Sequence, residues 1–229
     1  MSNLKNIQRK ISEGVSGWLL FEFNCFRGYL FNEKYISYPV GQILNSITEY
    51  KTLTEINHPC SNESQGRPLQ VDFVLIDSKK NWRYAFESKW IGNSSISLGS
   101  MIWDLIRLQN LFLHHPETKC YFILAGFDKK INILLEDFDL CHFPDSKKKN
   151  EIAKANSTYL NFNLNKLDDS TKKFINDKIK KYPKFNLYSK IRCRPAHKFP
   201  KNDIINMTFS TYIFEIKKPD VTTKVKTIE

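Results

Sequence analysis

The stretch GRPLQVDFVLIDSKKNWRYAFESKW, from Gly66 to Trp90, predicts the centre of the fold. It contains two runs rich in β-branched and aromatic residues, 69–76 and 82–91, on either side of the polar segment DSKKN. β-Branched and aromatic side chains pack well on a pleated surface, whereas Asp, Ser and Asn favour turns. We therefore expect two neighbouring strands that form a hairpin.

Asp72, Glu87 and Lys89 are charged residues inside these two largely apolar runs. Side chains two positions apart share a face of a strand, so Glu87 and Lys89 should point to one side of the sheet and Ser88 to the other. Charges on a buried strand are costly unless they are paired or bind a metal ion. Asp72 has apolar neighbours on the first run, and a tight hairpin would bring it beside Glu87. Two adjacent carboxylates raise each other's pKa unless a cation lies between them.

This arrangement is typical of a site for a hard divalent cation. Carboxylate oxygens suit Mg²⁺ or Mn²⁺ better than they suit zinc. Lys89 would lie near the ion without binding it, where it could orient an attacking water or help to deprotonate it. The alternative is a surface hairpin with an ordinary Glu–Lys pair, but that explains neither Asp72 nor the apolar neighbours of the two acids.

An Asp followed about fifteen residues later by Glu-x-Lys on the next strand resembles the PD-(D/E)xK nuclease superfamily, which includes restriction endonucleases. Asp72 matches the Asp of that motif, Glu87 its second acid and Lys89 its lysine, while Val71 stands in place of the Pro. The resemblance implies Mg²⁺, for which Mn²⁺ can substitute, held by the two carboxylates and often by the backbone carbonyl of Ser88. It also implies hydrolysis of a phosphodiester bond by an activated water.

The resemblance covers residues 15–127 and implies an α/β, restriction-endonuclease-like core in which helices flank a central mixed β-sheet. That fold has a helix after the third core strand, followed by a fourth strand. Apolar residues recur at helical spacing between 101 and 112, and YFILAG at 121–126 is typical of a central buried strand. A weakly alternating segment at 50–56 predicts another strand.

The N-terminal part adds a further candidate acid. We expect a short helix at 3–13, a break at Gly14 and then an apolar, buried helix that ends near Gly28. Glu22 is a lone acid on that second helix. Members of the superfamily often bring an acid from the first core helix to the metal, so the resemblance implies that Glu22 is a catalytic and metal-binding residue. The alternative is a carboxylate paired with Arg27.

Several other residues leave alternatives open. Pro39 predicts a break before a short helix at 42–46. Glu55, on the strand before the hairpin, is either a further ligand or a solvated residue at a strand edge. Asp104 and Arg107 lie three apart on the expected helix and can pair. Either that pair is structural, or Arg107 reaches the scissile phosphate or the metal-binding acids.

The charge changes along the chain, and we divide it there into a nuclease-like core, 1–140, and a basic α+β extension, 141–229, packed on the core. Residues 1–140 contain 15 Lys+Arg and 15 Asp+Glu, so the extension carries the whole net charge of +11. This asymmetry favours a polyanionic partner, duplex DNA first, although a lysine-rich composition is the alternative. In the extension we expect a helix at 171–181 and a strand at 207–216. Our candidates for contacts with nucleic acid are Arg107, Arg192, Arg194, Lys198 and Lys201.

Composition narrows the class of protein. No apolar stretch reaches the roughly 18 residues of a membrane-spanning helix, and the N-terminus lacks the apolar core of a secretory signal. The five cysteines form no CxxC pair, so we expect reduced thiols in a cytoplasmic protein. The leading hypothesis is a Mg²⁺-dependent DNA endonuclease of bacterial restriction, defence or repair, acting as a homodimer or with a partner protein of a defence system. The alternatives are a non-cleaving nucleic-acid-binding subunit that needs a partner, and a nuclease for RNA or single strands.

Overall fold

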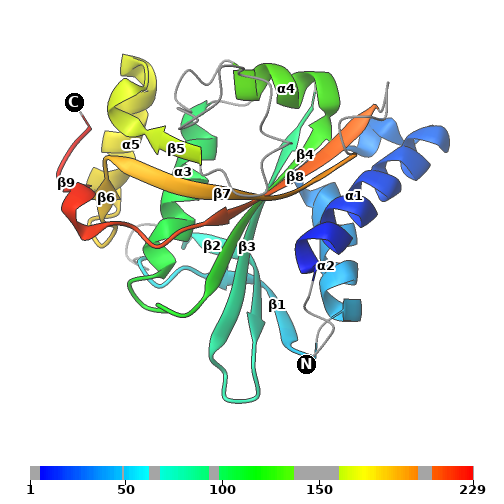
Figure 1. Ribbon diagram of the computed structural model, residues 1–229, viewed down its shortest axis with the longest axis horizontal. Coiled ribbons are helices and arrows are strands. Elements are labelled where there is room, and N and C mark those ends of the chain that lie inside the picture. The colour runs from blue at the N-terminus through cyan, green and yellow to red at the C-terminus, as the bar shows by residue number, and fades with distance from the viewer. Residues whose placement is uncertain are drawn as a thin grey trace.

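A mixed sheet forms the centre of the molecule, and helices cover both of its faces (Figure 1). The computed structural model describes residues 6–47, 49–61, 68–92, 98–136, 160–200 and 208–228. Within these ranges the main sheet has seven strands, in the spatial order β1 (Lys51–Asn57), β2 (Gln70–Ile76), β3 (Trp82–Ile91), β4 (Lys119–Phe127), β8 (Phe209–Ile216), β7 (Lys190–Phe199) and β5 (Leu160–Asn163). The α/β class and the mixed central sheet predicted from the sequence are confirmed.

The predicted hairpin is the pair β2–β3. It is antiparallel, with Phe73 opposite Phe86 and Val74 opposite Ala85. The neighbouring pair β3–β4 is parallel. Parallel neighbours need a crossover connection, and helix α3 (Leu98–Leu111) supplies it, as the helical spacing predicted. Strand β4 is buried along almost its whole length, as expected from its uninterrupted apolar run.

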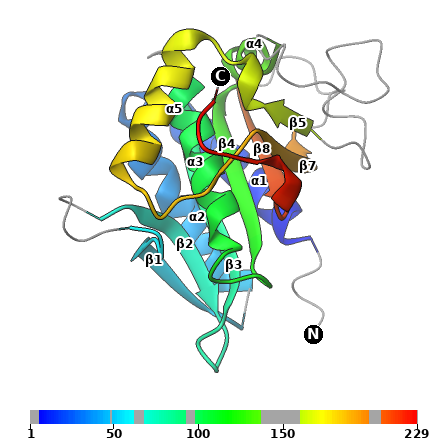
Figure 2. The same ribbon diagram turned by 90° about the vertical axis from the view of Figure 1, so that its left-hand side faces the viewer.

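The helices form one layer on each side of the sheet. Helices α1 (Ile7–Asn24) and α2 (Glu33–Ile47) pack on one face, and α3 and α5 (Asp169–Lys181) pack on the other (Figure 2). Helix α4 (Asp128–Glu136) follows β4, and β6 (Leu187–Tyr188) pairs with β9 (Lys224–Val225) beside the main sheet. The 3₁₀ turns are η1 (Gly28–Leu30), η3 (Leu164–Lys166) and η4 (Val221–Thr223). Within the described ranges, no helix combines the length and apolar character needed to cross a bilayer.

The C-terminal part completes the main sheet. Strand β8 lies between β4 and β7, and it is antiparallel to both. Its side chains are buried at almost every position because helix α1 covers one face of β8 and helices α3 and α4 contact it from the other. The proposed boundary near residue 140, which itself lies outside the described residues, therefore does not separate two sheets. The helix and strand expected at 171–181 and 207–216 are present as α5 and β8.

The expected break at Gly14 is wrong, because α1 runs through it as one helix. A Cβ at Gly14 would lie 2.6 Å from Cδ1 of Ile43, so this glycine allows α1 and α2 to approach closely. The helix is also less buried than its apolar sequence predicted. Phe21 and Phe23 are 58% and 44% exposed, because only one face of the helix meets the sheet.

The break expected at Pro39 is also wrong, because Pro39 lies inside α2. The segment 42–46 is the C-terminal part of this longer helix. Ile36, Val40 and Leu44 recur at intervals of four residues and are fully buried. A proline inside a helix costs about 3 kcal/mol, and burial of three large side chains contributes more than this. The apolar face of α2 therefore outweighs its proline.

Replacement of Gly126 by Ala should destabilise the sheet. A Cβ there would lie 2.1 Å from the backbone oxygen of Ile91, so β3 and β4 would have to move apart. We expect Gly126→Ala to lower the free energy of unfolding by roughly 1–3 kcal/mol or more. The control is Gly17→Ala on α1, where an added Cβ has no neighbour within 4 Å. Because Ala favours a helix more than Gly does, this variant should raise the free energy of unfolding by up to about 1 kcal/mol. Urea unfolding followed by circular dichroism measures both, and equal effects would contradict this account.

Candidate active site

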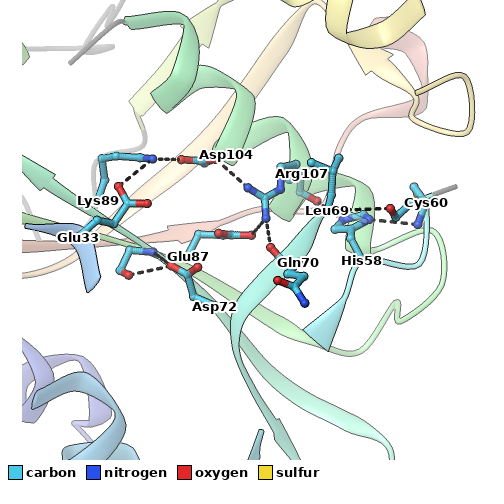
Figure 3. Close-up of polar contacts among 12 residues, drawn as sticks. Glu33, His58, Cys60, Leu69, Gln70, Asp72, Glu87, Lys89, Asp104 and Arg107 are labelled. Atoms are coloured by element: carbon cyan, nitrogen blue, oxygen red, sulfur yellow. Dashed lines mark hydrogen bonds and ion pairs between the residues drawn. The ribbon is translucent and has the colours of Figure 1, made fainter. Parts of the chain in front are cut away.

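A cleft of about 340 Å³ opens between the β2–β3 hairpin and α3, and it is lined mainly by charged side chains (Figure 3). It brings together Asp72, Glu87 and Lys89, the three residues of the sequence motif. The lining residues are Glu33, Glu55, Pro68, Leu69, Gln70, Asp72, Glu87, Lys89, Asp104 and Arg107. The residues of the motif thus share one space, although they come from two strands.

Burial raises the pKa of both motif acids. Asp72 accepts hydrogen bonds from the backbone N–H of Ser88 at 2.8 Å and from its hydroxyl at 2.7 Å. Burial raises the pKa of Asp72, and the bonds from Ser88 only partly offset this. Glu87 is 2% exposed, and burial raises its pKa well above the usual value; Arg107 opposes the shift and Asp72 adds to it. The structure thus places two acids together at a position that disfavours their charges.

Arg107 points into the cleft from α3. Its Nη2 lies 2.7 Å from Oε1 of Glu87, and its Nη1 lies 2.9 Å from Oδ1 of Asp104. It also donates to the backbone carbonyl of Gln70. Oε1 of Glu87 is thus held by an ion pair with Arg107, although no hydrogen bond of good geometry reaches it. Arg107 thus forms the expected pair with Asp104 and also reaches Glu87, so both alternatives for this residue stay open.

Lys89 lies between two carboxylates. Its Nζ is 2.8 Å from Oδ2 of Asp104 and 3.0 Å from Oε2 of Glu33. Burial alone would lower the pKa of Lys89, but the two acids outweigh burial and raise it above its usual value. Lys89 is therefore an ammonium ion at neutral pH.

The charges of the cleft fit an additional cation. Its five carboxylates face two cationic side chains, so the formal charge of its lining is negative. Asp72 and Glu87 offer carboxylate oxygens to this cleft, and Oε1 of Glu87 also pairs with Arg107. These features suit Mg²⁺ or Mn²⁺. Within the described residues, no three His, Cys, Asp or Glu side chains are already gathered around a point that could hold a metal.

Glu22 does not join this cleft, and the expectation that α1 brings it to the other acids is corrected. It accepts hydrogen bonds from Arg27 and from the hydroxyl of Tyr35, and these lower its pKa to about 2. This is the alternative that its spacing from Arg27 left open. Glu33 supplies the helical acid of the cleft instead. Sequence reasoning missed it because it began the helix after Pro39, whereas α2 begins at Glu33.

Glu55 lines the cleft from β1. In the register of β1 and β2 it falls between the pairs Thr54–Phe73 and Ile56–Val71, level with Asp72. Its φ of 50° is in the left-handed region, which is uncommon for a residue with a side chain. The backbone of β1 is therefore irregular at the position that lies level with Asp72. Glu55 is also exposed on the edge strand β1, so both hypotheses, a further ligand and a solvated residue at a strand edge, stay open.

The predicted basic cluster is not a single patch. Arg192 and Arg194 are exposed on β7, and Arg194 is opposite Glu215 of β8. Lys198 is opposite Tyr212, on the other face, and its Nζ lies 3.9 Å from Oδ1 of Asp128. An irregularity between Pro195 and His197 shifts the register and reverses which residues share a face. Lys201 lies outside the described residues, and β4 and β8 separate β7 from β3.

Comparison of the chain with models of protein families, with curated proteins and with solved structures gave no match.

Replacement of Asp72 by Asn should stabilise the metal-free protein at neutral pH. A carboxyl with a raised pKa favours folding below its unfolded pKa of about 4, and this contribution is lost as the pH rises through the folded pKa. Asn can still accept the bonds from Ser88 without a charge. The advantage of Asp72→Asn over wild type should therefore grow from about pH 4 to pH 7.

The matched control is Asp168→Asn at the N-cap of α5. Hydrogen bonds from Ser170 and Thr171 lower the pKa of Asp168, so its contribution is present above the unfolded pKa and lost on acidification. Any advantage of wild type over this variant should shrink at acidic pH. Urea unfolding in EDTA at a series of pH values measures both variants. A pH-independent difference for Asp72→Asn would contradict the burial of its charge.

Proposed function

We propose that this protein is a Mg²⁺-dependent endonuclease that hydrolyses phosphodiester bonds of DNA on a PD-(D/E)xK-like core. The observation that carries the proposal is the convergence of Asp72, Glu87 and Lys89 in one cleft whose acids outnumber its cations. The order of elements is further support, because α3 and β4 follow the Glu-x-Lys strand as the resemblance implies. Restriction, defence or repair in a bacterium is the setting we propose for it, with a second copy or a partner protein.

The metal ligands that we propose are Asp72 and Glu87, with the backbone carbonyl of Ser88 as the third oxygen that the resemblance implies. Ser88 has a second role, because its N–H and hydroxyl hold the carboxylate of Asp72 against β3. When bound, Mg²⁺ would polarise the phosphate and make a water molecule more acidic. Mn²⁺ has the same preference for oxygen ligands and should substitute.

Lys89 acts in this proposal as a cation and not as a base. An ammonium ion held by Asp104 and Glu33 has no lone pair with which to accept a proton. It can donate hydrogen bonds to the attacking water or to a phosphate oxygen on which negative charge develops. We therefore replace the sequence-based idea that Lys89 helps to deprotonate the water. Asp104 and Glu33 are the residues that orient it.

A non-cleaving nucleic-acid-binding subunit is the second candidate. One observation favours it: Asp104, Glu87 and Glu33 all have an ion-pair partner within the protein. In that case the acids would be structural, and the cationic side chains would balance them permanently. Direct measurement of cleavage separates the two candidates.

Lys89→Met should abolish most cleavage and leave the fold intact. Met keeps the length of the side chain but removes the charge that stabilises the transition state, so we expect a fall of about 10²–10⁴-fold in rate. Asp72→Ala should remove cleavage and weaken Mn²⁺ binding because an oxygen ligand is lost. The control is Lys79→Met, in the turn between β2 and β3 and outside the cleft lining. The assay follows supercoiled plasmid in Mg²⁺, with Ca²⁺ as the ion expected to support binding without cutting.

Equal behaviour of wild type and Lys89→Met would reject the catalytic proposal. This conclusion requires duplex, single-stranded and RNA substrates, with and without cell extract as a source of partners. The binding-subunit candidate would then replace it.

The two faces of β7 should contribute differently to DNA binding. Each lost phosphate contact lowers the slope of log affinity against log salt concentration by about 0.9 on duplex DNA. We expect this effect for Arg192→Ala and Arg194→Ala, whose side chains are exposed. Lys198→Ala should leave the slope unchanged, because Lys198 packs over the ring of Tyr212. Fluorescence anisotropy in Ca²⁺ measures the slopes, and an unchanged slope for all three variants would indicate that the net charge does not act through β7.

A further inference from the structure

His58 is a buried histidine that directly follows the last residue of β1, and it is 2% exposed. Its Nδ1 accepts a hydrogen bond from the backbone N–H of Cys60 at 3.1 Å. The other ring nitrogen, Nε2, lies 2.9 Å from the backbone oxygen of Arg107. Because Nδ1 accepts, Nε2 must carry the proton and donate to Arg107. Burial lowers the pKa of His58 to about 3, so the ring is neutral throughout the physiological range.

The backbone of His58 also forms a hydrogen bond on the β2 side of the cleft, across from Arg107. Its backbone N–H donates to the carbonyl of Leu69 at 2.7 Å, just before β2 begins. Leu69 and Gln70 line one wall of the cleft, and Arg107 lines the other. Figure 3 shows His58 beside both Leu69 and Arg107. One residue therefore ties the start of β2 to the turn of α3 that carries Arg107.

The ring of His58 is itself fixed by the C-terminal part of the chain. It stacks on Phe185, with ring centroids 4.7 Å apart and an angle of 25° between the planes. Phe185 also packs on Trp103 of α3, at 5.2 Å between centroids. The imidazole thus has little freedom to turn away from the carbonyl of Arg107.

We propose that His58 is a positioning residue that sets the separation of the two cleft walls, and thereby the position of Asp72 relative to Glu87 and Arg107. This inference rests on the proposed function, because it matters for metal binding only if Asp72 and Glu87 share an ion. His58 does not line the cleft and acts through the backbone of Leu69 and Arg107. Replacement of a residue that orients metal ligands without binding the metal typically lowers metal affinity by about 10–100-fold.

The test compares two conservative variants that keep a polar side chain. His58→Gln places an amide N–H near the position of Nε2, so it can still donate to Arg107. His58→Asn places its amide near Nδ1 and is too short to reach that carbonyl. We expect His58→Asn to weaken Mn²⁺ binding about tenfold or more and His58→Gln to stay within about threefold of wild type. The control is His115→Leu, which removes another stacked histidine, on Trp82, outside the cleft lining.

Mn²⁺ titration without DNA is the first measurement, and backbone hydrogen exchange at 69–73 and 104–108 is the second. Faster exchange in both segments in His58→Asn, beyond any change in global stability and restored in His58→Gln, supports the positioning role. Equal Mn²⁺ affinity and equal exchange in both variants would overturn it. If the wild type binds no Mn²⁺, the proposed function fails, and the exchange data alone decide whether His58 holds the two walls together.

Discussion

The balance of charge around Glu87 is the constraint on which the rest of the site depends. This carboxylate lies on a central strand of the sheet and is 2% exposed. The transfer of an ion into such surroundings costs several kcal/mol unless partners compensate for it. Arg107 compensates in part and is shared with Asp104, which in turn holds Lys89. These ion pairs connect β3, which carries Glu87 and Lys89, to Asp104 and Arg107 of α3 and to Glu33 of α2. The network therefore requires these elements to pack together around the cleft, beside Asp72 of β2.

This shared network also restricts the chemistry that the cleft can perform. Asp104 and Glu33 raise the pKa of Lys89 and so favour its ammonium form, which can stabilise negative charge. Glu87 already pairs with the guanidinium of Arg107, and a divalent cation would be attracted by the same acid. Acids gathered in this way destabilise a fold, and proteins keep such arrangements at functional sites at the expense of stability.

The cleft is supported by parts of the chain that are distant in sequence. Strand β8 completes the sheet beside β4, and Phe185 stacks on His58 behind the cleft. His58 in turn bonds to the backbone of Arg107 and Leu69. The C-terminal part is thus a structural component of the same domain as the motif. Its basic residues are distributed over both faces of β7 because the strand contains an irregularity.

The sequence by itself determined the hairpin, the crossover helix, the strand β4 and the shared face of Glu87 and Lys89, because these follow from local periodicity in apolar side chains. It also determined that Asp72 needs a partner. Only the tertiary structure decided which acids and cations meet there. Glu22 pairs with Arg27, and Glu33 pairs with Lys89. Arg107 lies in the cleft beside Glu87. The packing of the helices brings several charged residues within reach of one another, and ion pairing then selects the partners. Tertiary packing also decides why Gly14 and Pro39 do not interrupt their helices. The burial of a helix face against the sheet outweighs the local preference of these residues to break a helix.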